Sequence, residues 1–232
     1  MERDAVHLWR VQLTPPFDEA VLSQDELERA DRFQLAGLRD RYCAGRCALR
    51  TTLSRYLSIA PEAIVFQYNE HGKPLLAGCE LDFNLSNAHD LMLLGVTHGR
   101  MIGVDLEKRG RKVESSSIAK RFFSTHEVSQ LESLPVEDRG EAFLRGWVRK
   151  EAYVKALGTG ISGGLDNFAV SLEDKHVTPL LWKAEPSEDD ADWRFYDVNM
   201  GHAFLGCVAV TRNPCHLHIY DYPSPLTFQP AR

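Results

Sequence analysis

Apolar and other side chains alternate over residues 101–107 of the chain. The apolar positions are Ile102, Val104 and Leu106. A period of two is typical of a β-strand with one buried face, so Asp105 and Glu107 are predicted to project together from the other face. Neighbouring carboxylates repel one another unless a cation neutralises them. The stretch therefore predicts either a hard-metal site or a solvated strand edge, and by itself it favours the edge.

Two long segments, residues 38–57 and 137–157, have the apolar spacing of amphipathic helices. The predicted inner face of the first helix is Tyr42, Leu49, Leu53, Tyr56 and Leu57. Its arginines are predicted to lie largely on the solvent side, at Arg39, Arg41, Arg46 and Arg50. For Arg41 and Arg46 the alternative is that they face an anion. The predicted inner face of the second helix is Phe143, Trp147, Val154 and Leu157, with Gly158 as its C-cap.

Two serine–glutamate pairs have the spacing of a capping box, in which each residue satisfies the other's backbone amide. They are Ser23 with Glu26 and Ser124 with Glu127. Both pairs predict the start of a helix. For Glu127 the sequence leaves two alternatives open, a helix cap or a residue of the site.

Shorter apolar runs predict strands over residues 6–13, 64–68, 81–87, 91–96, 168–172, 193–198, 203–210 and 216–220. The last three are expected to close the second half. Because a strand, a capped helix, a long helix and further strands occur twice, we predict an α/β (α+β) protein of two similar subdomains in a pseudo-twofold arrangement. Each subdomain is a small, mostly antiparallel sheet packed with a long helix. The predicted boundaries are 1–100, 101–222 and a tail at 223–232.

Composition excludes several classes of protein. The chain has 232 residues and a net charge of −6, which argues against a broad nucleic-acid surface. No apolar run approaches the length of a membrane span, and the first residues do not resemble a signal peptide. The five cysteines form neither a C-x-x-C pair nor a metal-binding cluster with histidine. We therefore expect a cytoplasmic protein that binds neither nucleic acid nor membrane.

Glu151 and Lys155 lie four residues apart on the second predicted helix. Such a pair is usually a modest surface salt bridge. His216 and His218 have the spacing of metal ligands, but without further ligands they are more often part of a strand. Neither pattern settles a site without its neighbours.

Taken together, five motifs resemble the Sfp-type phosphopantetheinyl transferases over most of the chain. They are HGKP (71–74), FNLS (83–86), GVDLEK (103–108), RFFSTHE (121–127) and WVRKEAYVKALGTG (147–160). The resemblance implies transfer of phosphopantetheine from coenzyme A to a serine of an apo carrier protein, with release of adenosine bisphosphate. It also implies that Asp105, Glu107 and Glu151 hold Mg²⁺. Glu151, Lys155 and Asp105 would carry the chemistry, with Glu151 as the base for the serine and Lys155 at the departing bisphosphate.

The resemblance also implies contacts with the phosphates of coenzyme A. The matching positions are Lys73, Ser86, Arg41 and, less clearly, Arg46. The family usually has a histidine after the FNLS serine, whereas this chain has Asn87. Asparagine carries no charge, so the phosphate contact should weaken unless His89 replaces it. The alternative is that His89 only caps a hairpin.

The expected partners are apo acyl, peptidyl or aryl carrier proteins, and the two-halves length suggests a monomer. Gly103 is expected to let a phosphate or metal approach the backbone closely. A carboxylate-metal phosphodiesterase or nuclease is the main rival, because the same acids and lysine suit phosphate-ester hydrolysis. An inactive carrier-binding protein is the second rival. Retention of Asp105, Glu107, Glu151 and Lys155 together argues against inactivity.

Overall fold

The computed structural model describes residue 2 and residues 4–110, 115–160, 164–186, 190, 192–211 and 215–223. Most of the predicted tail, from residue 224 onward, therefore lies outside the described residues. Within the described part, no helix is both long and apolar enough to cross a membrane.

The first sheet has four strands, in the order β11 (His216–Asp221), β1 (Ala5–Gln12), β5 (Leu91–His98) and β4 (Leu81–Ala88). Strands β1, β5 and β4 are antiparallel neighbours, whereas β11 runs parallel to β1. The expectation that residues 216–220 close the second half is wrong, because β11 takes the free edge of β1, with His216 opposite Ala5. The boundary between the subdomains remains a prediction.

The second sheet has five strands, in the order β6 (Ile102–Lys108), β10 (Phe204–Val210), β9 (Arg194–Val198), β8 (Val177–Lys183) and β7 (Phe168–Val170). All its strand pairs are antiparallel. A separate hairpin pairs β2 (Phe66–Tyr68) with β3 (Pro74–Leu76).

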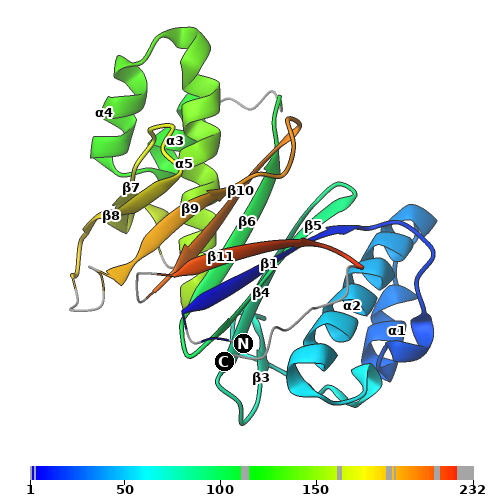
Figure 1. Cartoon of the computed structure of the whole chain (residues 1–232). Helices are drawn as coiled ribbons and strands as arrows, with labels where there is room; N and C mark the ends of the chain where they lie inside the picture. The colour runs from blue at the N-terminus through cyan, green and yellow to red at the C-terminus, as the bar shows by residue number, and fades with distance from the viewer. Residues whose placement is uncertain are drawn as a thin grey trace.

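Each sheet is packed with one long helix, as predicted. The helices are α1 (Gln24–Ala30), α2 (Ala36–Leu57), α3 (Ser115–Phe122), α4 (Thr125–Ser133) and α5 (Val136–Leu157), with short 3₁₀ turns at Glu19–Val21, Pro61–Ala63 and Leu165–Asn167. Figure 1 shows α1 and α2 beside the first sheet and α3, α4 and α5 beside the second. Leu49 and Leu53 of α2 pack with Trp9 and Phe83 of the first sheet. Ala152 and Val154 of α5 belong to a second core with Phe195 and Cys207.

A third core joins the two sheets. It contains Leu8 and Leu93 from the first sheet and Val104 and Val208 from the second. The alternation over residues 102–106 is confirmed, because all three apolar residues of β6 are buried in this shared core. The opposite face of β6, which carries Gly103, packs against α5.

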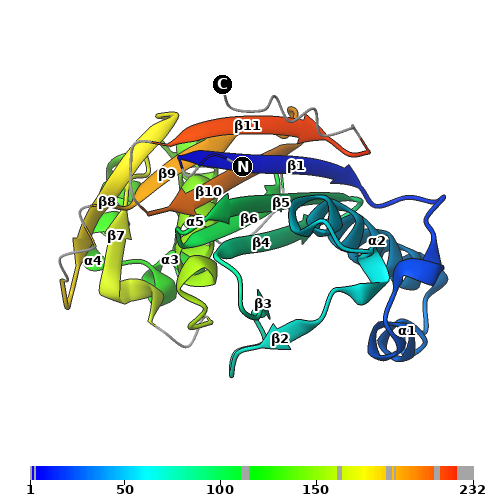
Figure 2. The same cartoon turned by 60° about the horizontal axis from the view of Figure 1, so that its bottom comes forward.

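Strands β4 and β6 lie side by side, one at the edge of each sheet (Figure 2). Side chains of β4 accept hydrogen bonds from the backbone of β6. Asp82 Oδ2 accepts from the Ile102 amide at 3.2 Å, and Asn84 Oδ1 accepts from the Val104 amide at 2.9 Å. Side-chain oxygens thus satisfy backbone groups on this edge of β6, and the seam between the halves is fixed in register.

One predicted solvent-facing residue of α2 is buried. The Arg50 side chain is 2% exposed, and its Nε donates to Glu26 at 2.6 Å. Its Nη1 also donates to the carbonyl oxygens of Pro61 and Ile64, both at 2.9 Å. The prediction that Arg50 lies outside is wrong because α1 and the chain after α2 supply partners for the charge. Arg46 binds the same Glu26 carboxylate.

Candidate active site

Helix α5 lies directly on strand β6 because β6 has a glycine at the point of contact. A Cβ on Gly103 would lie 1.9 Å from the carbonyl oxygen of Ala152 and 2.4 Å from the amide nitrogen of Ala156. No side chain fits there, so the glycine allows close packing of helix on strand. The expectation that Gly103 leaves room for a phosphate or metal is wrong, since the helix occupies that room.

The close packing brings Lys155 of α5 to Asp105 of β6 and Ser86 of β4. Lys155 Nζ lies 2.7 Å from Asp105 Oδ1 and 2.8 Å from Ser86 Oγ. The Ser86 hydroxyl donates to the same Asp105 oxygen at 2.9 Å. The side chain of Asp105 is 6% exposed and that of Lys155 30% exposed. Three elements from both halves therefore assemble an ammonium at the surface over a buried carboxylate.

Glu151 lies one turn before Lys155 on α5 and is buried. Within the described part of the chain, Glu151 Oε1 and Asp105 Oδ2 are both buried without a hydrogen-bond partner. Burial raises the pKa of Glu151, the charges of Asp105 and Glu107 raise it further, and Lys155 lowers it in part. A buried acid in this state is a candidate for proton transfer or for cation binding.

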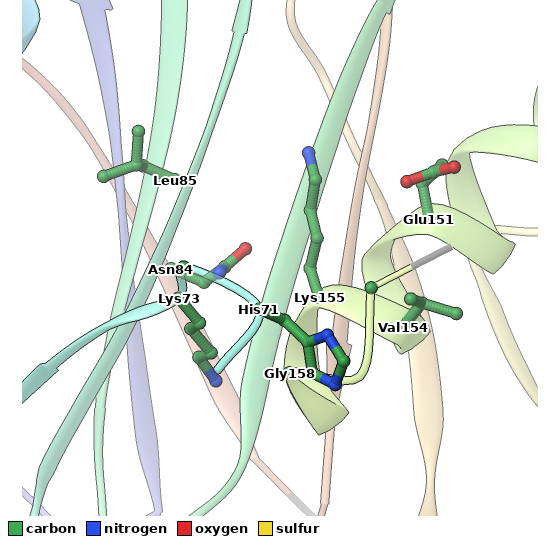
Figure 3. Close-up of a pocket in the computed structure, with 10 residues that line it drawn as sticks. His71, Lys73, Asn84, Leu85, Glu151, Val154, Lys155 and Gly158 are labelled. Atoms are coloured by element: carbon green, nitrogen blue, oxygen red, sulfur yellow. The ribbon is translucent and has the colours of Figure 1, made fainter. Parts of the chain in front are cut away.

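A pocket of about 250 Å³ opens between α5 and the turn that joins β2 to β3. Its lining is His71, Gly72, Lys73, Asn84, Leu85, Glu151, Val154, Lys155, Gly158 and Gly160. Figure 3 shows Glu151 and Lys155 extending from α5, with His71 reaching toward the helix from the turn. Both halves of the chain thus contribute to the pocket.

Lys73 lines this pocket, but its ammonium is engaged by the protein. Lys73 Nζ donates to the carbonyl oxygen of Ala156 at 3.0 Å, and its side chain is 11% exposed. Burial lowers the pKa of Lys73, although Asp82 opposes this effect. The predicted contact of Lys73 with a phosphate of coenzyme A remains a prediction, and the structure gives the residue a second role.

The two predicted arginines of α2 are not among the residues that line the pocket. Arg46 forms an ion pair with Glu26, and its guanidinium lies 4.6 Å from the centroid of the Phe66 ring. Arg41 is half-buried. Their contact with coenzyme A stays a prediction, and for Arg46 it would require the pair with Glu26 to be shared or exchanged.

Asn87 and His89 are exposed near the turn between β4 and β5. Asn87 Nδ2 lies 4.0 Å from the place that a Cβ on Gly45 of α2 would occupy. His89 has a φ of 57°, in the left-handed region that suits a tight hairpin. This backbone supports a hairpin role for His89, and its replacement of the family histidine stays a prediction.

The carboxylates offer a donor set that suits Mg²⁺. Asp105 Oδ2 and Glu151 Oε1 are unpartnered acceptors among the described residues, and Glu107 acts on Glu151 electrostatically. In the same part of the chain, no three His, Cys, Asp or Glu side chains are gathered closely enough to hold a metal ion. Magnesium commonly binds one or two carboxylates and completes its shell with water and substrate phosphate. The residues present fit a magnesium ion on those terms.

Glu127 forms the predicted capping box. Its Oε2 accepts from the Ser124 amide and hydroxyl, each at 2.8 Å, and pairs with Lys150 Nζ at 2.8 Å. Its Oε1 accepts from the Val170 amide at 2.9 Å, and the side chain is fully buried. The helix-cap alternative is confirmed, and a direct role in the pocket gains no support from this geometry.

The two histidines at the end of the chain lie on a strand, β11. His216 Nε2 is 3.6 Å from Asp4 Oδ2, and the His218 ring lies 5.4 Å from the His7 ring. The interpretation of this pair as part of a strand is confirmed.

Two residues that connect the pocket to its frame were missed in the sequence. Asp82 and Asn84 share a strand face with Ser86, and all three reach toward β6. The alternation in LDFNLSN carried this signal, because residues 82, 84 and 86 fall on one face of a strand. The sequence did not show that β6 is the neighbouring strand, and without that information Asp82 and Asn84 could not be recognised as the contacts between β4 and β6.

Two family models match consecutive parts of the chain. Residues 101–208 match the 4′-phosphopantetheinyl transferase superfamily, and residues 15–98 match the N-terminal part of a 4′-phosphopantetheinyl transferase. The first match contains Asp105, Glu107, Glu151 and Lys155.

Several curated proteins are similar to this chain. It is 44% identical to the 4′-phosphopantetheinyl transferase HetI of Nostoc sp. over 168 residues. The aligned segment covers 68% of this chain and 71% of HetI. It is 30% identical over 203 residues to the 4′-phosphopantetheinyl transferase Sfp of Bacillus subtilis, covering 87% and 88%. It is 31% identical over 200 residues to a phosphopantetheinyl transferase of Thraustochytrium sp., covering 76% and 69%. The chain therefore belongs to the 4′-phosphopantetheinyl transferase superfamily, a family of transferase enzymes.

Proposed function

We propose that this enzyme transfers phosphopantetheine from coenzyme A to a serine hydroxyl of an apo carrier protein, with Mg²⁺ as cofactor and adenosine 3′,5′-bisphosphate as the second product. The family acts on carrier proteins in general. The observation that carries the finer proposal is the group formed by Glu151, Asp105 and Lys155 beside the pocket. It combines two unpartnered carboxylate oxygens with an ammonium, as transfer from a pyrophosphate requires.

Coenzyme A would lie with its pyrophosphate beside Lys155. The side chain of Lys155 is 30% exposed while Asp105 and Ser86 hold its ammonium from below. The position of Nζ is therefore fixed before substrate arrives, which reduces the reorganisation needed in the transition state. Lys155 would donate a hydrogen bond or a proton to the departing bisphosphate.

Glu151 is the proposed base, acting directly or through a water. The serine oxygen forms a bond to the β-phosphorus, the bond from that phosphorus to the bridging oxygen breaks, and the serine proton passes to Glu151. The base role is supported by the position of Glu151 on the pocket lining and by its Oε1, which is an acceptor without a hydrogen-bond partner among the described residues.

Asp105 and Glu151 would hold the magnesium ion directly through their unpartnered oxygens. Glu107, the third predicted ligand, would act through its charge, since no three such side chains are gathered in the described part of the chain. When bound, the ion would neutralise the pyrophosphate and strengthen its polarisation. The protein's own contribution is to keep Asp105 Oδ2 and Glu151 Oε1 free of hydrogen bonds from the described residues. Burial of these two carboxylate oxygens costs free energy unless a cation lies beside them.

We further propose that the enzyme acts as a monomer in the cytoplasm. Support for a monomer is that both halves of one chain line the pocket. Support for a reducing compartment is that the five cysteines are free thiols. The carriers proposed are acyl, peptidyl or aryl carrier proteins.

The proposal is tested by incubating the enzyme with coenzyme A, MgCl₂ and one apo carrier of each type, then weighing the carriers. A gain of one phosphopantetheine that disappears with EDTA supports it. Glu151→Gln should slow the gain about 10³-fold, whereas the matched variant Glu62→Gln, which changes an exposed glutamate, should not. Hydrolysis of a phosphodiester with no gain on any carrier would instead favour the rival hydrolase.

A further inference from the structure

The hairpin of β2 and β3 holds the C-terminal end of α5. Lys73 Nζ donates to the carbonyl oxygen of Ala156 at 3.0 Å. Asn69 Nδ2 donates to the carbonyl oxygen of Gly158 at 2.8 Å. The last carbonyl groups of a helix have no partner within it, and a cation there is also favoured by the helix dipole. The first half of the chain therefore supplies the cap of the helix that carries Glu151 and Lys155.

Lys73 joins α5 to the seam between the sheets as well. Its Nζ lies 3.5 Å from the carbonyl oxygen of Ile102 on β6 and 3.7 Å from Asp82 Oδ2 on β4. Asp82 in turn accepts from the Ile102 amide. One ammonium thus contacts the helix, the strand beneath it and the neighbouring strand of the other half.

The turn that carries these residues is internally braced. Asn69 Oδ1 accepts from the amides of His71 at 3.0 Å and Lys73 at 2.8 Å. The turn also packs tightly on the helix end, because a Cβ on Gly158 would lie 2.8 Å from Asn69 Nδ2. Glycine at this point has a φ of 72° and ends the helix without pushing the turn away.

From this geometry we infer that Asn69 and Lys73 are positioning residues, which fix the last turn of α5 and hold Lys155 on Asp105. The inference rests on the proposed function for the role of Lys155. Lys155 directly precedes Ala156, whose carbonyl Lys73 binds. Residues of the same turn and of the same helix line the pocket, so these contacts also join two parts of its lining.

A positioning role for Lys73 and a phosphate contact by Lys73 predict different kinetic effects when the lysine is replaced. Loss of a lysine that binds the substrate mainly raises KM. Loss of a lysine that aligns a catalytic group mainly lowers kcat. Misplacement of a reacting group by about 1 Å can cost about 100-fold in rate. Loss of one tether among several is expected to cost about tenfold.

The test compares Lys73→Met and Asn69→Ala with wild type, using coenzyme A, Mg²⁺ and an apo carrier. Rates are expressed per coenzyme A-binding site from calorimetry, so that unfolded protein does not count. We expect kcat to fall about tenfold in each variant, with KM for coenzyme A changed less than kcat. Gln67→Ala, an exposed residue of the same hairpin, is the control and should match wild type. A rise in KM larger than the fall in kcat overturns the inference, as does wild-type behaviour.

Hydrogen exchange tests the same contacts without any catalysis. The amide of Gly158 donates to the carbonyl of Val154 in the last turn of α5. We expect amides 154–158 to exchange about tenfold faster in Asn69→Ala and Lys73→Met, while amides of α2 are unchanged. Unchanged protection overturns the inference even if transfer is observed. If wild type proves to have no transferase activity, faster exchange still establishes the tether, and only the proposed function fails.

Discussion

Glu26 and Glu151 are buried glutamates of the first and second half of the molecule, the first packed against the long helix α2 and the second on the long helix α5. The two carboxylates have opposite surroundings. Glu26 is bound by Arg46 and Arg50 of α2, and the Ser23 amide donates to it as well. Glu151 of α5 has Asp105 and Glu107 as its electrostatic neighbours, with partial relief from Lys155. The first carboxylate is compensated within the protein, and the second is not.

The difference appears in the pKa of each group. Burial alone would raise the pKa of Glu26, but Arg46, Arg50 and the Ser23 amide bring it below its ordinary value. Burial and Asp105 raise the pKa of Glu151 above its ordinary value. The lack of compensation is not common to all buried glutamates of the second half. Glu127 is also buried there, and its charge is compensated by Lys150. A missing partner, not burial, distinguishes the site from the scaffold.

The largest expected effect is on activity, from Glu151→Gln. The substitution keeps the shape but removes both the proposed base and a magnesium ligand. We expect transfer to an apo carrier, measured as kcat/KM, to fall about 10³-fold, equivalent to about 4 kcal/mol of transition-state stabilisation. Activity within about tenfold of wild type would show that Glu151 is neither base nor essential ligand.

Glu26→Gln should have the opposite profile, with a large loss of stability and little loss of activity. It leaves Arg46 and Arg50 beside a neutral amide, and breaking a buried pair by removing one partner costs about 3–5 kcal/mol. Chemical denaturation of the two variants measures this directly. The rate per folded molecule should stay near that of wild type, because Glu26 is not among the residues of the pocket lining. Equal stability losses in Glu26→Gln and Glu151→Gln would remove the distinction between the two carboxylates.

Gly103→Ala tests whether close packing of α5 on β6 is what assembles the site. The added methyl would meet backbone atoms of Ala152 and Ala156, which cannot move without shifting the helix. We expect a loss of about 2 kcal/mol in unfolding free energy, typical of overpacking, together with lower activity. The matched control is Gly140→Ala on the same helix, where a Cβ meets nothing within 4 Å. That variant should be slightly more stable, by about 0.5–1 kcal/mol, since alanine favours helix.

Local patterns in the sequence predicted much of this frame. The alternation around Asp105 gave the strand, and the apolar spacing gave both long helices to within two residues. The burial of Arg50 was missed because its partner, Glu26, belongs to another helix, and periodicity within α2 carries no information about it. The pairing of β11 with β1 was missed for a similar reason, since it joins the two ends of the chain.

The site was only partly predictable for the same physical reason. Glu151 and Lys155 share a helix face, and their spacing showed it. The sequence could not show whether Glu151 and Lys155 form a surface salt bridge with each other. The answer depends on Asp105 of β6, which forms the ion pair with Lys155. Lys73 was expected at a phosphate, and its contact with the Ala156 carbonyl depends on the meeting of hairpin and helix. Such contacts are fixed by tertiary packing, which no local pattern contains.

The smallest expected effect is a pH-dependent difference in stability between wild type and Glu151→Gln, both measured in EDTA. The pKa of Glu151 is raised in the folded state above its ordinary value of 4.5. Below that value the carboxyl is protonated in both states, so the two proteins should differ least. As the pH rises through the folded pKa, ionisation destabilises the fold of wild type, whereas the neutral amide of the variant has no such penalty. The variant should therefore become the more stable protein toward neutral pH.

The difference between the two proteins cancels the titration of buried groups that lie away from Glu151. Burial lowers the pKa of His7 to about 4, with a smaller contribution from His218, so its stabilisation is lost as the pH falls from 6.5 toward 4. That loss occurs equally in both proteins and cancels in the difference. Thermal unfolding of each protein from about pH 4 to 8 gives the curve. A second series with MgCl₂ in place of EDTA should narrow the gap at neutral pH, because the ion stabilises wild type more than a variant that lacks one ligand. A gap that does not change with pH would mean that the Glu151 charge is compensated after all, and the contrast with Glu26 would fail.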